Sequence, residues 1–228
     1  MLDLGCGTGF MINLGRDLVE EIHGVDITPA MMAKVDRSGP AKIELFESDT
    51  GKFAPRGEYD VATAYSFLHH LYDIRPTCET AFKALKKGGA FYADLEPNFY
   101  FWQAIGGLKR DGAYDPMVKR EIEMVTYKDE DIERNFGVPK QVFHDAEWGK
   151  NVTGGFREED TRAMLLDVGF REVDVFYHWF LGQASLLNEE RYAGEDRFHI
   201  AAAMDGMLQR SMPLSRQLFK YVGIVARK

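Results

Sequence analysis

The chain opens with a short apolar stretch that runs directly into a glycine-rich turn, Met1-Leu-Asp-Leu-Gly-Cys-Gly-Thr-Gly9. Glycine has no Cβ and adopts positive φ readily, so Gly5, Gly7 and Gly9 allow the backbone to approach a ligand closely. A helix expected over residues 8–20 would point its positive N-terminus at that ligand. The pattern predicts a parallel strand, and hence an α/β sheet, with a nucleotide-like cofactor at its end.

Two other cofactor classes share glycine-rich turns and can be compared by spacing. A phosphate-binding P-loop requires Gly-x-x-x-x-Gly-Lys-Ser/Thr, which the sequence lacks. A dinucleotide turn has its third glycine one place later than Gly9, where this chain has Phe10. The spacing disfavours both.

A second apolar stretch, Ile22-His-Gly-Val-Asp26, ends in an acid about 20 residues beyond the turn. A carboxylate at the end of a second strand can accept two hydrogen bonds from ribose hydroxyls. The alternative is a surface acid that opens a turn before Pro29. After this glycine turn, we favour the ribose-binding role for Asp26.

Together these motifs resemble the class I S-adenosylmethionine-dependent methyltransferases of the small-molecule type. The stretch 2–9 matches the first motif of that family, and Gly24-Val-Asp-Ile27 matches the second. Three further segments follow in the order of the family: the adenine-site segment 46–50, the fourth-strand motif 59–71, and the turn into strand five with its carboxyl end, 85–98. The resemblance therefore extends over most of the chain.

The resemblance implies an α/β, Rossmann-like class I methyltransferase sheet, mostly parallel, with seven strands of which the last pair is antiparallel. It implies S-adenosylmethionine as cofactor and S-adenosylhomocysteine as product. Ile27 and Met31 would pack on adenine and ribose, unless they are ordinary core, and Asp3 would fix the amino-acid end or brace the turn. The full set of expected cofactor-binding residues is Asp3, Gly5, Gly7, Thr8, Asp26, Ile27, Met31, Asp49, Thr50, Tyr65 and Ser66.

Alternation of strand and helix patterns supports this architecture. Strands are expected over residues 1–4, 22–27, 42–48, 59–66, 90–96, 170–181 and 219–226. Helices are expected after Thr28, which would cap the Pro29 start, from Asp73 to Lys86, over 158–168, and partly over 187–210. The alternation of strand and helix patterns is lost between residues 98 and 155. We expect a cofactor-binding core at 1–97, an inserted lid for substrate recognition at 98–155, and the rest of the methyltransferase domain at 156–228.

Composition narrows the class of protein further. The 228 residues carry 28 basic and 36 acidic side chains, a formal net charge of −8, and no basic block interleaved with aromatics, which disfavours a nucleic-acid substrate. The two cysteines, Cys6 and Cys78, have no metal-type spacing, so no metal site is predicted and a reducing cytoplasm is expected. No run reaches the ~20 apolar residues of a membrane span, and no signal peptide is visible.

The acceptor side of the site offers few candidates. His69 follows strand four near the expected methyl group and could act as a general base, although a structural role is an open alternative. Glu96 at the end of strand five could face the substrate or cap the next helix. In the aromatic cluster 99–102, Tyr100 and Trp102 suit an apolar or flat substrate, or else anchor the lid.

The resulting hypothesis is methyl transfer to oxygen, nitrogen or carbon of a small-molecule acceptor by in-line displacement in a lidded pocket. A catalytically silent cofactor-binding module and a nicotinamide oxidoreductase are the alternatives from other classes. The family normally has helices before strand one, so we also expect Met1 to be an internal methionine of a longer natural protein. Oligomeric state stays open.

Overall fold

A computed structural model of the chain describes residues 1–188 and 196–228, which form two compact units. Unit 1 comprises Met1–Glu96, Glu158–Val175 and Gly223–Lys228, and unit 2 comprises Pro97–Arg157 and Phe176–Val222. The segment 98–155 that we expected as an insertion falls within unit 2, to which the structure adds Phe176–Val222. Its role as a lid stays a prediction.

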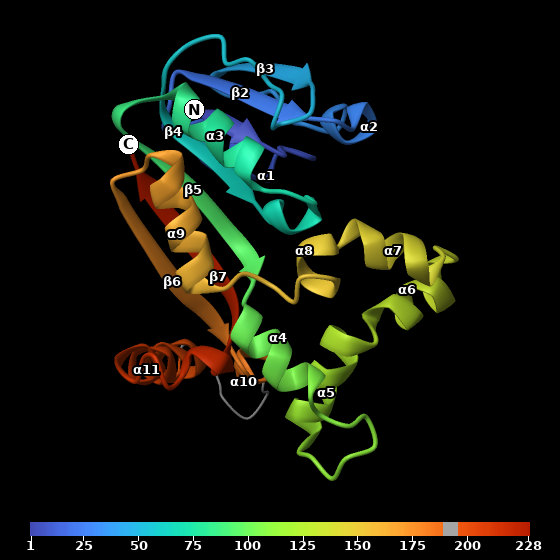
Figure 1. Cartoon of the computed structure of the whole chain (residues 1–228). Helices are drawn as coiled ribbons and strands as arrows, with labels where there is room; N and C mark the ends of the chain where they lie inside the picture. The colour runs from blue at the N-terminus through green and yellow to red at the C-terminus, as the bar shows by residue number, and fades with distance from the viewer. Residues whose placement is uncertain (189–195) are drawn as a thin grey trace. The chain divides into compact units, whose positions relative to one another are not determined.

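The central element is a seven-stranded sheet with the order β3-β2-β1-β4-β5-β7-β6 (Figure 1). Its first five strands in sequence pair in parallel. The strand β7 runs antiparallel to both neighbours: Gly88 N donates to Lys228 O at 2.9 Å, and Arg171 N donates to Arg227 O at 2.8 Å. The predicted sheet is therefore confirmed. The strands are β1 (Leu2–Leu4), β2 (Glu21–Asp26), β3 (Lys42–Glu47), β4 (Tyr59–Tyr65), β5 (Leu85–Pro97), β6 (Glu172–Phe180) and β7 (Phe219–Arg227).

The glycine turn packs tightly against β2. A Cβ on Gly24 would lie 2.7 Å from Leu45 Cδ2 and 3.0 Å from Cys6 Sγ, so the sheet and the turn meet closely only because this residue is glycine. Burial raises the pKa of the Cys6 thiol, which suits a small packing residue and not a nucleophile.

Five short helices belong to unit 1, and two of them depart from the sequence prediction. The N-cap of α1 is Gly9 in the left-handed conformation, with φ +89°, and the helix ends at Gly15 instead of residue 20. α3 ends at Ala84 and not at Lys86, because β5 already begins at Leu85. The helices are α1 (Phe10–Gly15), α2 (Pro29–Met32), the 3-10 turn η1 (Leu68–His70), α3 (Arg75–Ala84) and α9 (Glu158–Val168).

Two predicted helix caps and one helix contact can be compared with the structure. The N-cap of α3 is Ile74 and not Asp73, but the Asp73 side chain still accepts from the Arg75 amide, at 3.0 Å, just before the helix. The Thr28 side chain makes no capping hydrogen bond within the described chain, and its own amide donates to Asp26 Oδ1 instead.

α3 and α9 lie side by side (Figure 1), joined by the ion pair between Arg75 and Asp167 at 2.7 Å.

Unit 2 is mostly helical. For much of it, residues 98–155, the sequence showed only that the alternation of strand and helix patterns is lost. Its core is a cluster of Phe101, Trp102, Ile105 and Ile122. α11 covers much of the helix expected over 187–210, while residues 189–195 of that prediction lie outside the described chain. The helices are α4 (Phe99–Gly106), α5 (Pro116–Thr126), α6 (Lys128–Phe136), α7 (Lys140–Ala146), α8 (Trp148–Asn151), α10 (Gln183–Leu187), α11 (Asp196–Arg210) and the 3-10 turn η2 (Arg216–Leu218).

Asn98 ties the parts of unit 2 together. It has no exposed surface, and its side-chain nitrogen donates to Arg216 O at 2.7 Å and to Phe219 O at 2.6 Å. Its side-chain oxygen accepts from Tyr100 N at 3.1 Å and so caps α4. One amide thus satisfies backbone groups from three segments of unit 2.

Across the residues that the structure describes, no helix has the length and apolar character that a membrane crossing needs.

We expect Asn98→Ala to destabilise unit 2 by about 2–4 kcal/mol, because two buried carbonyls lose their donor and α4 loses its cap. The measurement is urea unfolding followed by tryptophan fluorescence, since all three tryptophans, Trp102, Trp148 and Trp179, belong to unit 2. Asn135→Ala, at an exposed position on α6, is the matched control and should stay within about 0.5 kcal/mol of the original protein. Equal midpoints for the two variants would contradict the role of Asn98.

Candidate functional site

The glycine turn at the carboxyl end of β1 has the backbone of a ligand cradle. Gly5, Gly7 and Gly9 have φ values of +74°, +51° and +89°, which side chains rarely tolerate. A Cβ on Gly5 would lie 2.1 Å from the Phe67 ring, so Gly5 is required by packing. A Cβ on Gly7 would meet open space, with Met31 Cε at 3.9 Å its nearest described neighbour. Gly7 therefore leaves room for a ligand against the backbone.

Asp26 joins this turn to the end of β2. Its Oδ2 accepts from Gly7 N at 2.9 Å, and its Oδ1 accepts from Thr28 N at 2.8 Å. Each carboxylate oxygen can accept a further hydrogen bond, so these contacts do not prevent ribose binding. The two sequence motifs thus meet at one carboxylate.

Apolar side chains surround the turn and remain open to solvent in unit 1. Phe10 is 50% exposed, Ile27 is 68% exposed and Met31 is 40% exposed. The Phe10 ring stacks on Tyr65 at the end of β4, with ring centroids 4.4 Å apart. Exposure at Ile27 and Met31 speaks against the ordinary-core alternative, and it suits a flat ring that covers them.

Asp3, two residues before the turn, is held by the neighbouring strand β4. It is buried in β1, and Thr63 Oγ1 donates to its Oδ1 at 2.7 Å. Burial raises the pKa of Asp3 to about 7, with the nearby Asp26 charge adding to the rise and the Thr63 hydrogen bond opposing it. Both roles that we expected for Asp3, at the amino-acid end of the cofactor and as a brace of the turn, stay predictions.

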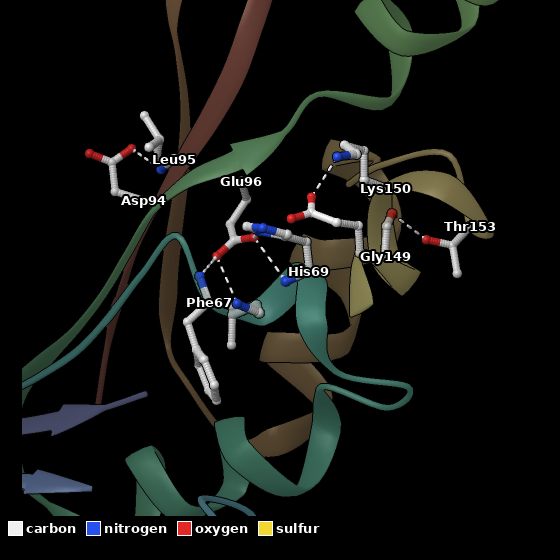
Figure 2. Close-up of polar contacts among 10 residues, drawn as sticks. Phe67, His69, Asp94, Leu95, Glu96, Gly149, Lys150 and Thr153 are labelled. Atoms are coloured by element: carbon white, nitrogen blue, oxygen red, sulfur yellow. Dashed lines mark hydrogen bonds and ion pairs between the residues drawn. The ribbon is translucent and has the colours of Figure 1, made fainter. Parts of the chain in front are cut away.

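The turn after β4 is held by a buried carboxylate. Glu96, at the end of β5, has no exposed surface, and its Oε1 accepts from the amides of Phe67 at 3.1 Å and Leu68 at 2.9 Å. Figure 2 shows the same carboxylate against His69, whose amide donates to Oε2 at 3.0 Å and whose Nδ1 lies 2.7 Å from that atom. Both oxygens are therefore used by the turn, and Glu96 here positions His69 instead of presenting an open group to a substrate.

This arrangement decides what the His69 imidazole can do. When Nδ1–H donates to the Glu96 carboxylate, the lone pair lies on Nε2, and the negative charge stabilises the imidazolium that forms when Nε2 accepts a proton. A histidine oriented by a carboxylate is the arrangement of a general base. His70, next to it, is exposed, with ring centroids 4.2 Å apart.

A polar pair on β5 had no counterpart among the residues predicted from the sequence. Tyr92 OH donates to Asp94 Oδ2 in a short hydrogen bond, and the Asp94 backbone oxygen accepts from Ser66 N at 2.8 Å. Ser66 and Leu95 have positive φ values, +49° and +60°, so the backbone is strained at the carboxyl ends of both β4 and β5. Polar residues at positions 92, 94 and 96, in the otherwise apolar second half of β5, could have indicated this cluster.

The remaining expected cofactor residues are placed as follows. Thr8 and Asp49 are exposed, and Asp49 accepts from Gly51 N at 2.9 Å. The Thr50 hydroxyl is buried against Thr77 Oγ1 at 2.8 Å, so its side chain serves packing. Burial and the Asp94 charge raise the pKa of Tyr65. Cofactor contacts at these positions and at Ser66 stay predictions.

The two expected substrate residues in the aromatic cluster belong to unit 2. Trp102 is 9% exposed and lies in the core cluster of that unit. The Arg216 guanidinium lies over the Tyr100 ring, 3.5 Å from its centroid. The packing of Trp102 fits the anchoring alternative, and a substrate role for either residue stays a prediction.

Comparison with known proteins agrees with this geometry. Residues 2–91 match the methyltransferase domain family. A probable S-adenosylmethionine-dependent methyltransferase of Mycolicibacterium smegmatis is 23% identical over 175 residues, which are 76% of this chain and 58% of that protein. A ubiquinone biosynthesis O-methyltransferase of Hydrogenovibrio crunogenus is 28% identical over 43% of this chain and 44% of its own. The chain spans 44–62% of the length of the curated relatives that it matches.

Solved structures show the same fold. An S-adenosylmethionine-dependent methyltransferase of Archaeoglobus fulgidus superposes with a TM-score of 0.55 at 18% identity, covering all of this chain and 85% of that one. Phosphoethanolamine N-methyltransferase 2 of Haemonchus contortus, in complex with S-adenosylmethionine, gives a TM-score of 0.54 at 14% identity, covering 48% of that chain. Residues 2–91 thus match a methyltransferase domain, and the sheet has the fold of the class I methyltransferases. The predicted fold is confirmed, and the predicted family agrees with the matching family model and with the relatives.

Burial of Asp3 generates a prediction for the pH dependence of stability. An acid whose pKa is raised on folding, from 3.8 to about 7, takes up a proton when the protein folds. Its contribution to stability is present below pH 4 and is lost as the pH rises to 7. Asp3→Asn should remove this loss, so the variant gains stability relative to the original protein across that window. Thermal unfolding by circular dichroism between pH 4 and 8 measures it, with exposed Asp17→Asn as the control. If Asp3→Asn and the original protein differed in stability by the same amount at every pH, the raised pKa of Asp3 would be contradicted.

Proposed function

We propose that this protein transfers the methyl group of S-adenosylmethionine to a small-molecule acceptor. The observation that carries the proposal is the hydrogen bond from Gly7 N to Asp26 Oδ2, because it joins the two cofactor motifs into one cradle. The open space beside Gly7 and the exposed Ile27 and Met31 fit a nucleoside with a flat base. The cradle thus fits the cofactor of the family.

The binding roles follow from the chemistry of each group. The Asp26 carboxylate would accept hydrogen bonds from the ribose hydroxyls, and Ile27 and Met31 would cover the adenine. Asp49 would meet the adenine amino group, and the backbone at Tyr65 and Ser66 would meet the amino-acid end. When bound, the cofactor supplies an electrophilic methyl group on a sulfonium and leaves as S-adenosylhomocysteine. The protein then has to orient the acceptor and exclude water, which can supply roughly 7–11 kcal/mol.

The proton on the acceptor is the second requirement. A phenol, alcohol or ammonium must lose a proton when it is methylated, and His69 Nε2 is the atom that we assign to accept it. Glu96 orients the imidazole through Nδ1 at 2.7 Å. A carbon acceptor that is already an anion would not need this base.

The net charge of the chain favours one class of methyl acceptor over another. The relatives include ubiquinone biosynthesis O-methyltransferases and an 18S rRNA (guanine-N(7))-methyltransferase of Schizosaccharomyces pombe. A formal net charge of −8 opposes binding to an RNA backbone, which favours a small molecule here. A role of Tyr100 and Trp102 of unit 2 in binding an apolar or aromatic acceptor stays a prediction. A catalytically silent module remains the competing hypothesis.

Calorimetric titration tests the cofactor site. We expect S-adenosylmethionine and S-adenosylhomocysteine to bind, and Asp26→Asn to weaken both at least about tenfold, because the ribose contact loses its charge and the turn loses an acceptor. Asp17→Asn, at an exposed position in unit 1, is the matched control and should bind like the original protein. Binding of NAD in preference to the adenosyl ligands would overturn the proposal. Cofactor binding without S-adenosylhomocysteine formation across a broad acceptor panel would favour the silent module.

Kinetics test the base. With an acceptor that carries an O–H or N–H group, His69→Gln should lower kcat by about 10²–10⁴-fold with a smaller change in KM, because the proton loses its acceptor. Glu96→Gln should also lower kcat, by a smaller factor, because the imidazole loses the carboxylate that orients it through Nδ1. His199→Gln on α11, where the ring is exposed, is the control. An unchanged kcat in a folded His69→Gln protein would assign His69 a purely structural role.

A further inference from the structure

The edge of the sheet formed by β2 and β3 carries a compact group of charged side chains. In the parallel register of the two strands, Glu21 lies beside Lys42 and His23 lies beside Glu44. Side chains two residues apart point to the same face of a strand, so all four project from one face of the sheet. The group lies at the amino-terminal half of these strands, while the glycine turn and Asp26 lie at the carboxyl end.

His23 is the buried member of this group. It is 7% exposed, its ring packs edge-on against Phe46 and Tyr59, and its Nδ1 lies 2.6 Å from Tyr59 OH. Its other nitrogen, Nε2, is buried without a hydrogen-bond partner among the described residues, although Glu21 Oε1 is only 3.4 Å away. Buried polar atoms are rarely left unsatisfied, and each such atom requires an explanation.

We propose that Glu21, His23 and Glu44 form a site for a divalent cation of the zinc type. One ligand atom from each residue lies within 4.8 Å of the other two, with His23 Nε2 and one oxygen from each carboxylate. One imidazole nitrogen with two carboxylate oxygens is a donor set for Zn²⁺, whereas Mg²⁺ and Ca²⁺ prefer oxygen alone. Three protein ligands leave a fourth position for water.

The surroundings of His23 have the form that metal-ligating histidines need. A ligating imidazole donates its second N–H to a neighbouring acceptor, which fixes the tautomer and the orientation of the ring. When Nδ1–H donates to the Tyr59 hydroxyl, the Nε2 lone pair points to the carboxylates. Glu21, His23 and Tyr59 also line a surface hollow of about 810 Å³, through which an ion can arrive.

Lys42 already shows that the two carboxylates hold a cation. Its ammonium nitrogen lies 2.8 Å from Glu21 Oε1 and 2.6 Å from Glu44 Oε1, while its side chain is 65% exposed. A surface ion pair of this kind adds little stability, and a flexible lysine can swing into solvent. The metal would therefore compete with the Lys42 ammonium, and removing that ammonium should favour the metal.

The test uses protein purified without a histidine tag and stripped of metal with a chelator. In calorimetric titrations we expect one equivalent of Zn²⁺ to bind at this site. Co²⁺ bound at the same site should show the visible absorption of a four-coordinate ion. His23→Gln should remove that equivalent, and Tyr59→Phe should weaken it about tenfold. Lys42→Met should tighten it several-fold, the opposite of what a general loss of structure would do.

The controls separate this site from other zinc-binding groups. His199→Gln and Lys52→Met, at exposed positions, should leave the equivalent unchanged. Glu44→Gln, a surface change that does not disturb the core, should lose it even if His23→Gln proves unstable. Equal Zn²⁺ binding by the original protein and Glu44→Gln, or no gain with Lys42→Met, would overturn the proposal. None of these readouts depends on methyl transfer.

Discussion

The hydrogen bond between Gly7 N and Asp26 Oδ2 is the contact on which the cofactor end of unit 1 depends. A glycine turn with three positive φ values is an unlikely shape for a free chain, because so many other conformations are available to glycine. Asp26 reduces this freedom by holding the turn from the neighbouring strand, as do the amides of Gly5 and Cys6, which donate to Val25 O at 2.8 and 3.1 Å. The cradle is therefore a property of two strands together, and Gly24 is needed so that they can approach.

A second carboxylate, Glu96 at the end of β5, also holds a turn, the one after β4. Unlike Asp26, Glu96 is fully buried. Removing an ionised carboxylate from water is costly unless hydrogen bonds and charge replace the lost hydration. Three backbone amides and the His69 imidazole do so here. The turn after β4 and the base are thus fixed by one buried charge. Removing it would disturb the backbone of the turn as well as the orientation of the imidazole, so a variant at Glu96 has to be compared with one at His69.

The sequence allowed prediction wherever structure depends on neighbours along the chain. The glycine turn, Asp26 and the seven strands follow from local patterns of glycine, acid and apolar residues, and from the resemblance that those patterns carry. Contacts set by tertiary placement could not be predicted. The partners of Glu96 lie 27 to 29 residues away, so capping of α4 was as reasonable as any other role. Asn98, the next residue but one, is the residue that caps α4.

Strand register limits prediction in the same way. The stretches Glu21-Ile-His23 and Lys42-Ile-Glu44 each alternate polar and apolar residues, which identifies two half-exposed strands. Only the register of the two strands places His23 beside Glu44. If one strand were shifted by one residue, its polar side chains would lie on the opposite face of the sheet. The absence of cysteine pairs led us to expect no metal site, because cysteine spacing is visible in sequence whereas ligands from paired strands are not.

The strand β2 connects the two sites argued above. His23 and Asp26 are three residues apart, which on an extended strand is about 10 Å. A cation at His23 is therefore too far away to touch a cofactor held by Asp26, yet both ligands would hold β2 in its folded conformation. Each ligand that binds only the folded chain adds to its stability by mass action. If β2 is rigid in the folded state, the two contributions to stability add. Cooperative binding would instead show that the amino end of β2 moves in the free protein and that the cation orders the strand on which the glycine turn rests.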